Sequence, residues 1–160
     1  MGLRPARTSR ELKGQPWTRL SIRRPRKSYV KGVPHNKVRQ FIMGTDKPYE
    51  VEVVLELQSP IQIRDNSLES ARQACNKVLE KNLLANYFMQ VTKYPHFVLR
   101  ESASLGVAGA DRISKGMKRA FGKPKGRLVR VKEGEVIFKV RGMKKNIAVI
   151  KKALERAKIK

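Results

Sequence analysis

The chain is poor in the residues on which disulfide scaffolds, metal sites and many active sites depend. Of its 160 residues, one is cysteine, two are histidine and 13 are acidic. A single cysteine excludes a disulfide within the chain and suits a reducing compartment. Cys75 falls on the apolar face of a predicted helix, which favours a small buried core residue over a reactive thiol. No ligand spacing typical of zinc is present, so we expect no metal site.

Long hydrophobic runs are missing as well. No apolar segment approaches the roughly 20 residues that a membrane-spanning helix needs. The N-terminus is basic but lacks the apolar stretch of a signal peptide. An Arg-rich transit peptide is disfavoured because Pro5, Gly14, Pro16 and Pro25 interrupt any amphipathic helix there. We therefore expect no membrane partner.

Catalytic patterns are also lacking. The two histidines give no Ser-His-Asp or Cys-His arrangement, and His96 fits a structural or RNA-facing role better than a catalytic one. A phosphate-binding P-loop fails because five residues, not four, separate Gly116 from Gly122, and Pro124 follows Lys123 where a hydroxyl is required. We expect no enzymatic activity, no cofactor and no small-molecule substrate.

Positive charge is what the chain has in excess. It holds 37 Lys and Arg residues and has a formal net charge of +24. Such charge repels itself unless a polyanion neutralises it, and nucleic acid is the usual polyanion. An anionic membrane is the alternative, but it calls for an amphipathic or lipidated segment. The net charge is +9 over residues 1–36, +2 over 37–100 and +13 over 101–160. This division predicts a basic, RNA-binding N-terminal extension (1–36) and a single α+β domain (37–160).

The N-terminal extension has few apolar residues and no sustained period, so it cannot offset its ordering entropy alone. It is either a disordered tail or an arm that becomes ordered on RNA. Trp17 and Tyr29 favour the arm, because aromatic residues among arginines stack on bases, although they could equally pin the arm to the core. The candidate RNA-binding residues here are Arg4, Arg7, Arg10, Arg19, Arg23, Arg24, Arg26, Lys27 and Lys31.

The nearly neutral middle of the chain is foldable. Alternation of apolar and polar residues predicts strands. Their expected ranges are 37–43, 49–57, 88–93 and 97–100. Glu50, Glu52 and Glu56 alternate along one strand and fit a solvated face better than a metal or acid–base site.

The strongest predicted helix follows Asp65 and Asn66, which offer an N-cap, with Glu69 placed for a capping box. Its apolar face comprises Leu68, Ala71, Cys75, Val78, Leu79 and Leu83.

The C-terminal third has a second pattern of strands and a helix. We expect a turn over 122–126 and a hairpin of strands 127–132 and 135–141 around Glu133-Gly134. A final helix begins near Met143 and is expected to dock on the sheet. Its apolar stripe comprises Ile147, Ile150, Leu154 and Ala157.

Between these parts lies an uncharged stretch that suggests a flexible loop. It comprises Ser102, Ala103, Ser104, Leu105, Gly106, Val107, Ala108, Gly109 and Ala110. Asp111 can cap a short helix over 112–121, whose start would suit a phosphate, although a plain linker is the alternative. The GxxG at 106–109 is a weak KH-domain signal because it is uncharged and follows a strand. Further RNA-binding candidates are Arg112, Lys115, Lys118, Arg119, Lys123 and Lys125.

Several of these stretches occur together in one family. They are Arg4-Pro5-Ala6-Arg7, Gly32-Val33-Pro34, Lys37-Val38-Arg39, Met43-Gly44, Leu68-Glu69-Ser70-Ala71-Arg72, Tyr94-Pro95-His96, Val98-Leu99-Arg100-Glu101, Ala108-Gly109-Ala110-Asp111-Arg112, Gly116-Met117 and Ala120-Phe121-Gly122-Lys123-Pro124. In order and spacing they resemble the universal large-subunit ribosomal protein family called L sixteen in bacteria and L ten e in archaea, with the archaeal type closer. Lys118-Arg119 and Thr8-Ser9 depart from the family pattern and put single RNA contacts in doubt.

The resemblance implies an α/β-hammerhead-like fold, in which a mixed, mostly antiparallel sheet packs with two main helices. It implies a structural, cytoplasmic role in the large ribosomal subunit, where the partners are rRNA, tRNA and neighbouring ribosomal proteins. It places the chain near the A-site tRNA and directs the loop over 101–111 toward the peptidyl-transferase region, in support of tRNA accommodation.

Overall fold

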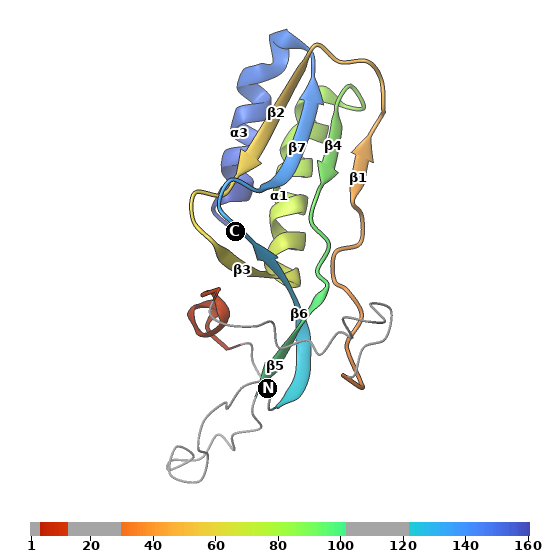
Figure 1. Cartoon of the computed structure of the whole chain (residues 1–160). Helices are drawn as coiled ribbons and strands as arrows, with labels where there is room; N and C mark the ends of the chain where they lie inside the picture. The colour runs from red at the N-terminus through yellow and green to blue at the C-terminus, as the bar shows by residue number, and fades with distance from the viewer. Residues whose placement is uncertain (1–3, 13–29, 102–121) are drawn as a thin grey trace.

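A computed structural model describes residues 4–12, 30–101 and 122–160 (Figure 1). The described part holds two long helices and seven strands. In chain order the elements are the short 3-10 helix η1 (Ala6–Ser9), β1 (Ile42–Gly44), β2 (Val51–Glu56), β3 (Ile61–Arg64), α1 (Asp65–Leu83), β4 (Phe88–Val91), β5 (Phe97–Glu101), β6 (Lys123–Val131), β7 (Val136–Gly142), the 3-10 turn η2 (Lys144–Asn146) and α3 (Ile147–Lys158).

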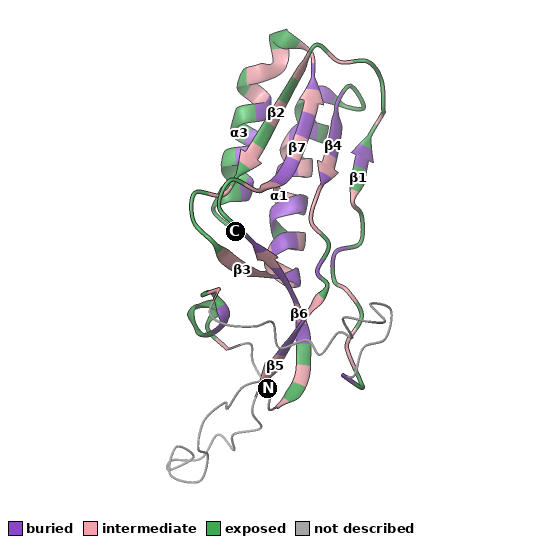
Figure 2. Cartoon of the chain, viewed as in Figure 1, coloured by how far each residue is buried: buried purple, intermediate pink, exposed green. Residues whose placement is uncertain are grey.

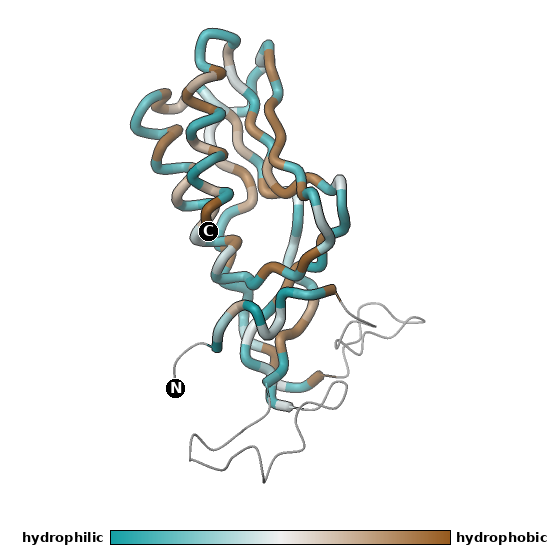
Figure 3. Tube along the Cα trace, turned by 90° about the vertical axis from the view of Figure 1, so that its left-hand side faces the viewer, coloured by the Kyte–Doolittle hydropathy of each residue, from teal (hydrophilic) through white to brown (hydrophobic). Residues whose placement is uncertain are grey.

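The strands form two separate antiparallel sheets. One has four strands in the order β1-β4-β7-β2, and the other has three in the order β3-β6-β5. Both long helices lie on one face of the four-stranded sheet and form a second layer, as the turned view in Figure 3 shows. The α+β class with two main helices is therefore confirmed, and every described strand pairing is antiparallel.

The core lies between the helices and the four-stranded sheet (Figure 2). Period-two alternation in β2 and β7 aligns Val53 with Val140 and Leu55 with Phe138, so both strands direct apolar side chains toward the helices. The predicted stripe of α1 is confirmed, since Leu68 and Leu79 are almost completely buried in this core. Cys75 is fully buried, and desolvation raises the pKa of its thiol to about 12, so it is an inert core residue.

Helix α3 uses its apolar stripe against α1 as well as against β2 and β7. Ile150, Leu154 and Ala157 are buried as expected, whereas Ile147 is only partly covered. The approach is close at Gly142 in β7, where an added Cβ would lie 2.7 Å from Ile150 Cδ1 and the end of that side chain would have to shift. The predicted docking of the last helix on the sheet is therefore confirmed, with α1 as an additional partner.

The predicted β6–β7 hairpin is wrong. Glu133 and Gly134 do form the expected turn, but β6 pairs with β3 and β5 while β7 pairs with β2 and β4. The turn instead binds the end of β2, where Gly134 N–H donates to Leu57 O and Leu57 N–H donates to Glu135 O. Local alternation specifies strands but not their partners, and burial of Phe138 and Val140 over the helices decides the pairing of β7.

Three local predictions also need correction. Residues 122–126 form no turn, because Lys123 already begins β6, and a register shift beside Pro124 accommodates the proline. Most of 37–43 forms no strand, since Lys37 N–H and Arg39 N–H donate to carboxylates of α1. Strand β3 was not predicted at all, because four residues before a helix give too short a pattern.

Candidate RNA-binding surface

The three-stranded sheet holds both ends of the segment 102–121. Glu101 at the end of β5 is paired with Lys123 at the start of β6, so the chain leaves and returns at one place. Arg100 Nε donates to Gly122 O at 2.9 Å across the same end. We call this arrangement of Arg100, Glu101, Gly122 and Lys123 the stem.

The N-terminal segment 4–12 is docked on β3 by one arginine. Arg64 is buried, and its guanidinium donates to Ser9 Oγ at 3.2 Å, to Arg4 O at 2.6 Å and to Pro5 O at 3.0 Å. The planar guanidinium suits three acceptors because its donors are fixed in a fork. Its partners are mainly backbone carbonyls, so the segment keeps its own cationic side chains for other contacts.

Gln62 holds the next part of the same segment. Its side-chain Nε2 donates to Ser9 O at 3.2 Å and to Glu11 O at 2.7 Å, and its backbone N–H donates to Arg10 O at 2.8 Å. Glu11 also forms an isolated antiparallel bridge with Ile61. Residues 4–12 are therefore held against β3 by contacts with the protein itself.

Residues 30–37 reach the same end of the molecule from the other side (Figure 1). Arg127 Nε in β6 donates to Pro34 O at 2.9 Å, and Val30 is buried. We define the basic end as residues 4–12, 30–37, 97–101 and 122–127. These ranges hold nine Lys and Arg residues against Glu11 and Glu101.

The basic end brings together the predicted RNA-binding residues that the structure describes. Arg4 forms an ion pair with Glu101, with 3.7 Å between Nε and Oε2. Five other predicted cations are exposed, and within the described ranges no side chain pairs with them. These five, which we call the open cations, are Arg7, Arg10, Lys31, Lys123 and Lys125.

Other predicted site residues lie outside the described ranges. They are Arg19, Arg23, Arg24, Arg26, Lys27, Arg112, Lys115, Lys118, Arg119 and the loop Ser102–Ala110. The described residues on either side of these two segments, 12 and 30 for 13–29 and 101 and 122 for 102–121, nevertheless belong to the basic end.

Cations on the four-stranded sheet are paired, in contrast to the open cations. Arg141 lies 3.3 Å from both Asp46 Oδ1 and Glu52 Oε2, and its guanidinium lies 4.6 Å from the centroid of the Phe88 ring. Lys139 Nζ lies 3.5 Å from Glu52 Oε1. The glutamates predicted to form a solvated strand face include Glu52, which serves here as a partner for cations of β7.

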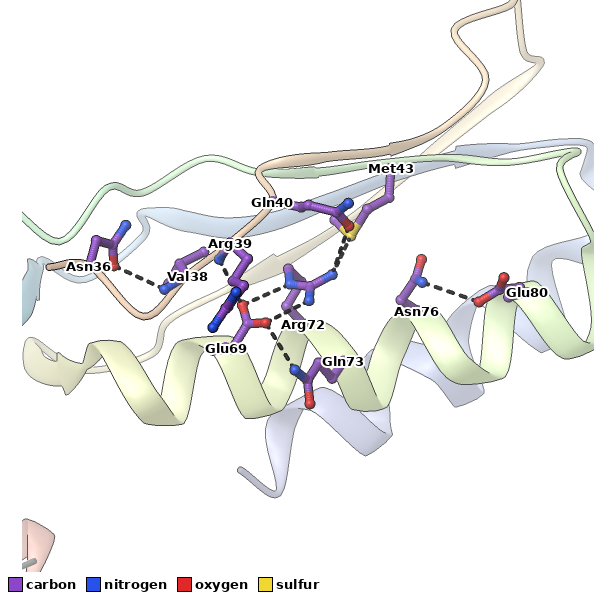
Figure 4. Close-up of polar contacts among 10 residues, drawn as sticks. All are labelled: Asn36, Val38, Arg39, Gln40, Met43, Glu69, Arg72, Gln73, Asn76 and Glu80. Carbon is purple, nitrogen blue, oxygen red and sulfur yellow. Dashed lines mark hydrogen bonds and ion pairs between the residues drawn. The ribbon is translucent and has the colours of Figure 1, made fainter.

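Glu69 does not form the predicted capping box. The N-cap of α1 is Arg64, and no side chain caps it. Glu69 instead accepts from Arg72 Nε at 2.8 Å, Arg72 Nη2 at 2.6 Å, Gln73 Nε2 at 3.0 Å and Arg39 N–H at 3.3 Å (Figure 4). Hydrogen bonds from Arg72 are the main reason that the pKa of Glu69 is lowered. The carboxylate thus fastens the segment before β1 to α1.

The residues that position the surface were missed in the sequence. Arg64 and Gln62 hold the N-terminal segment, Arg100 closes the stem, and Arg127 holds Pro34. In a chain this basic, a positioning arginine has the same sequence appearance as an RNA-contacting one. Only its burial and its carbonyl partners distinguish it.

His96 is exposed, and its ring centroid lies 4.7 Å from that of Tyr94, which stacks on Phe41 at 5.4 Å. The structural or RNA-facing role of His96 stays a prediction. Among the described residues, no three His, Cys, Asp or Glu side chains are grouped so as to hold a metal ion. None of the described helices has the length and apolarity needed to cross a bilayer.

Comparison with known proteins places this chain among ribosomal proteins. A family model described as ribosomal protein L16p/L10e matches residues 17–160. A protein of Caldivirga maquilingensis named large ribosomal subunit protein uL16 is 41% identical over all of this chain and 90% of its own length. The proteins of the same name from Staphylothermus marinus and Picrophilus torridus are 42% and 40% identical, over 98% and 100% of this chain and 87% and 88% of their own lengths. The chain therefore belongs to the ribosomal protein L16p/L10e family.

Proposed function

We propose that this protein is a structural constituent of the large ribosomal subunit and that it binds rRNA through the basic end. The observation that carries this proposal is that open cations from three distant parts of the sequence, one of them Lys31, lie together at the basic end. Arg7 and Arg10 come from the docked N-terminal segment, and Lys123 and Lys125 come from β6. Phosphate contacts by such side chains fix the register of a protein on RNA.

Binding of RNA by the open cations would also neutralise part of the net charge of +24 and so relieve its repulsion. Each phosphate contact releases counterions, which favours binding most strongly at low salt. The carbonyl-directed contacts of Arg64 and Gln62 hold the segment in place beforehand, so less ordering entropy is lost when RNA binds. This proposal selects a pre-docked arm for residues 4–12, rather than a disordered tail.

A second part of the proposal concerns the uncharged loop over 102–110. The segment 102–121, which contains this loop, begins and ends at the stem, where Glu101 of β5 is paired with Lys123 of β6. A neutral loop on a basic anchor can approach tRNA without binding it permanently, because it contributes few phosphate contacts. We propose that the loop lies near the A-site tRNA and the peptidyl-transferase region and supports tRNA accommodation.

The test is a pair of reconstituted large subunits, one for each of two variants. Deletion of 102–110 removes no cation, so occupancy on the subunit is expected to persist while tRNA accommodation and peptide synthesis slow. Replacement of Lys118, Lys123 and Arg119 by alanine is expected to lower occupancy first. If the deletion abolishes occupancy while the triple variant binds normally, the loop is the anchor and this division of roles is wrong.

Two other classes of function make different predictions. A free KH-like regulator would bind a short single strand and would leave the subunit in a high-salt wash, whereas a structural constituent sediments with it. An RNA-modifying enzyme would need a polar cluster in a pocket. In the described ranges the charged groups of the four-stranded sheet serve ion pairs instead, and the relatives carry names of ribosomal subunit proteins.

A further inference from the structure

The outer face of α3 is a second concentration of positive charge, on a different element from those of the basic end. Residues 143–160 hold seven Lys and Arg residues and one acid, Glu155. All seven cations are exposed, and within the described ranges no ion pair to their charged groups is formed, although Lys144 N–H donates to Glu50 Oε2 at 2.9 Å. They are Lys144, Lys145, Lys151, Lys152, Arg156, Lys158 and Lys160.

The neighbouring helix shows that this charge is not a general property of the helical layer. Helix α1 lies beside α3 and also exposes one side to solvent, yet it carries three bases and three acids. Its acid Glu69 is fully engaged by neighbouring donors. Two helices of one layer thus differ in charge while serving the same core.

The stability of α3 does not account for its cations. Arg156 and Lys158 lie in the last turn, where cations interact favourably with the helix dipole. Lys151 lies in the first half of the helix, outside the range of that effect, and Lys144 and Lys145 precede the helix at the end where cations are unfavourable. Lys152 and Arg156 are also spaced i,i+4, which places like charges side by side. Glu155 is spaced i,i+4 from Lys151, but one acid can offset only part of the charge of four cations.

The four cations within the helix flank the side of α3 that faces away from the core. Ile150, Ala153, Leu154 and Ala157 occupy the inner side. At 1.5 Å per residue the helix is about 18 Å long, and Lys152 and Arg156 are about 6 Å apart along its axis. The helix thus presents two short rows of cations, Lys151 with Lys158 and Lys152 with Arg156, on either side of Glu155. Such rows can contact a polyanion backbone without any base contact.

We propose that the outer face of α3 binds the phosphate backbone of a second rRNA segment, different from the segment held by the basic end. Lys151, Lys152, Arg156 and Lys158 are the contacting residues. This inference rests on the proposed rRNA-binding function and adds a second site to it. The two sites lie on different elements, so the protein would join two RNA segments rather than bind one.

Site-directed cleavage of RNA tests this inference without removing a cation. Ala148 lies on the outer face of α3, Ala6 lies at the basic end and Ser70 lies on the exposed face of α1, and all three are exposed. Each is replaced by cysteine in turn and carries a tethered hydroxyl-radical source. The native Cys75 needs no replacement, because it is fully buried.

The probes are compared on the full chain bound to large-subunit rRNA. The A148C and A6C probes are expected to cleave two different rRNA segments, and the S70C probe is expected to cleave much more weakly than either. Cleavage from A6C but not from A148C would overturn the second site. If none of the three probes cleaved rRNA, the proposed rRNA-binding function would itself be refuted, and the second site with it.

A charge variant gives an independent measure. The K151Q/K152Q/R156Q protein is expected to reduce the slope of log affinity against log salt by about two to three, since each lost phosphate contact removes about 0.7–0.9. The matched control is K77Q/K81Q on α1, which is expected to leave the slope unchanged. An unchanged slope in the triple variant, with a native circular dichroism spectrum, would overturn the inference. If the triple variant lost its helical signal, the A148C cleavage experiment would decide instead, because that variant keeps every cation.

Discussion

The basic end and the four-stranded sheet in the layered body of this protein treat charge in opposite ways. In the body, formed by α1, α3 and the four-stranded sheet, cations of the sheet are matched by acids, as Lys139 and Arg141 are by Glu52. At the basic end, the charged side chains of Arg7, Arg10 and Lys123 have no partner within the described ranges. The difference shows that this chain is stabilised in one region and left electrostatically incomplete in another.

The separation has a structural basis. The body contains the main apolar core, with Phe138 and Leu79 almost completely buried, and therefore does not depend on RNA for its packing. The basic end is joined to it through hydrogen bonds from residues such as Arg64 and Gln62 to backbone carbonyls. Because those bonds use backbone carbonyls, the cationic side chains of Arg7 and Arg10 in the docked segment remain exposed to solvent. The comparison can therefore be tested by perturbing each region and measuring stability and RNA affinity separately.

The largest expected effect is that of salt on RNA affinity. Six to ten neutralised phosphates would lower affinity by about three to five decades between 50 and 200 mM salt. The unfolding free energy of the body should change far less, because its exposed ion pairs each contribute less than about 1 kcal/mol. Filter binding and urea denaturation over the same salt series measure the two quantities. An affinity that barely changed over this range would contradict the electrostatic account of the basic end.

Removal of Glu69 should give the largest loss of stability in the body. Arg72 is buried, and Glu69→Ala would leave its guanidinium without a counter-charge, at a cost of about 3 kcal/mol. Glu80→Ala is the matched control on the exposed side of α1 and should cost under about 1 kcal/mol. Urea denaturation measures both. Equal losses in the two variants would show that the Glu69–Arg72 pair is not what fastens residues 36–43 to the helix.

The same residue gives the protein a defined response to acid. The pKa of Glu69 is lowered in the folded state, chiefly by hydrogen bonds from Arg72. Its stabilisation is therefore complete above the ordinary glutamate pKa and is lost as pH falls through the lowered value. Glu69→Ala should be less sensitive to pH in that acidic window than the parent protein.

Arg64→Ala should have a smaller effect on stability and a marked effect on RNA binding. It removes three hydrogen bonds to residues 4–9, with an expected cost of about 1–3 kcal/mol. Hydrogen exchange at the Gln62 amide, which donates to Arg10 O, should accelerate. RNA affinity should fall about as far as in the Arg7→Ala/Arg10→Ala double variant. Arg64→Lys keeps the charge but lacks the planar fork, so it should behave like Arg64→Ala. Normal affinity in Arg64→Ala would mean that docking of the segment is irrelevant to binding.

The contrast between the two regions also explains what the sequence could predict. The α1 stripe from Leu68 to Leu83 and the alternation in β2 were predicted correctly, because burial against one layer imposes a clear period. The β6–β7 hairpin failed because the Glu133-Gly134 turn is local, whereas the partners of Phe138 are distant in the sequence. Periodicity reports which face is buried and says nothing about which strand lies alongside.

The candidate surface was predicted in part for a related reason. Arg7 and Lys125 were recognised from charge and motif, and the structure places both at the basic end. Arg64 was overlooked because its role depends on three acceptors about 55 to 60 residues away along the chain. Glu69 was assigned to a cap because the capping-box spacing was present, but the neighbouring guanidinium of Arg72 is a stronger partner than a backbone N–H.

The smallest expected effect provides the most direct test of the comparison. Glu52→Gln removes the acid that pairs with Lys139 and Arg141, all of which are about 36–40% exposed. Pairs of this exposure contribute less than about 1 kcal/mol, so the unfolding free energy should hardly change.

Lys123→Gln at the basic end removes one open cation and should reduce the slope of log RNA affinity against log salt by about 0.7–0.9. If the sheet face does not contact RNA, Glu52→Gln should leave that slope unchanged, although it releases two cations from their partner. A slope that became steeper by about one would show that Lys139 or Arg141 had become a phosphate contact. The pairing in the body would then mask a binding surface, and the division between the two regions would have to be redrawn.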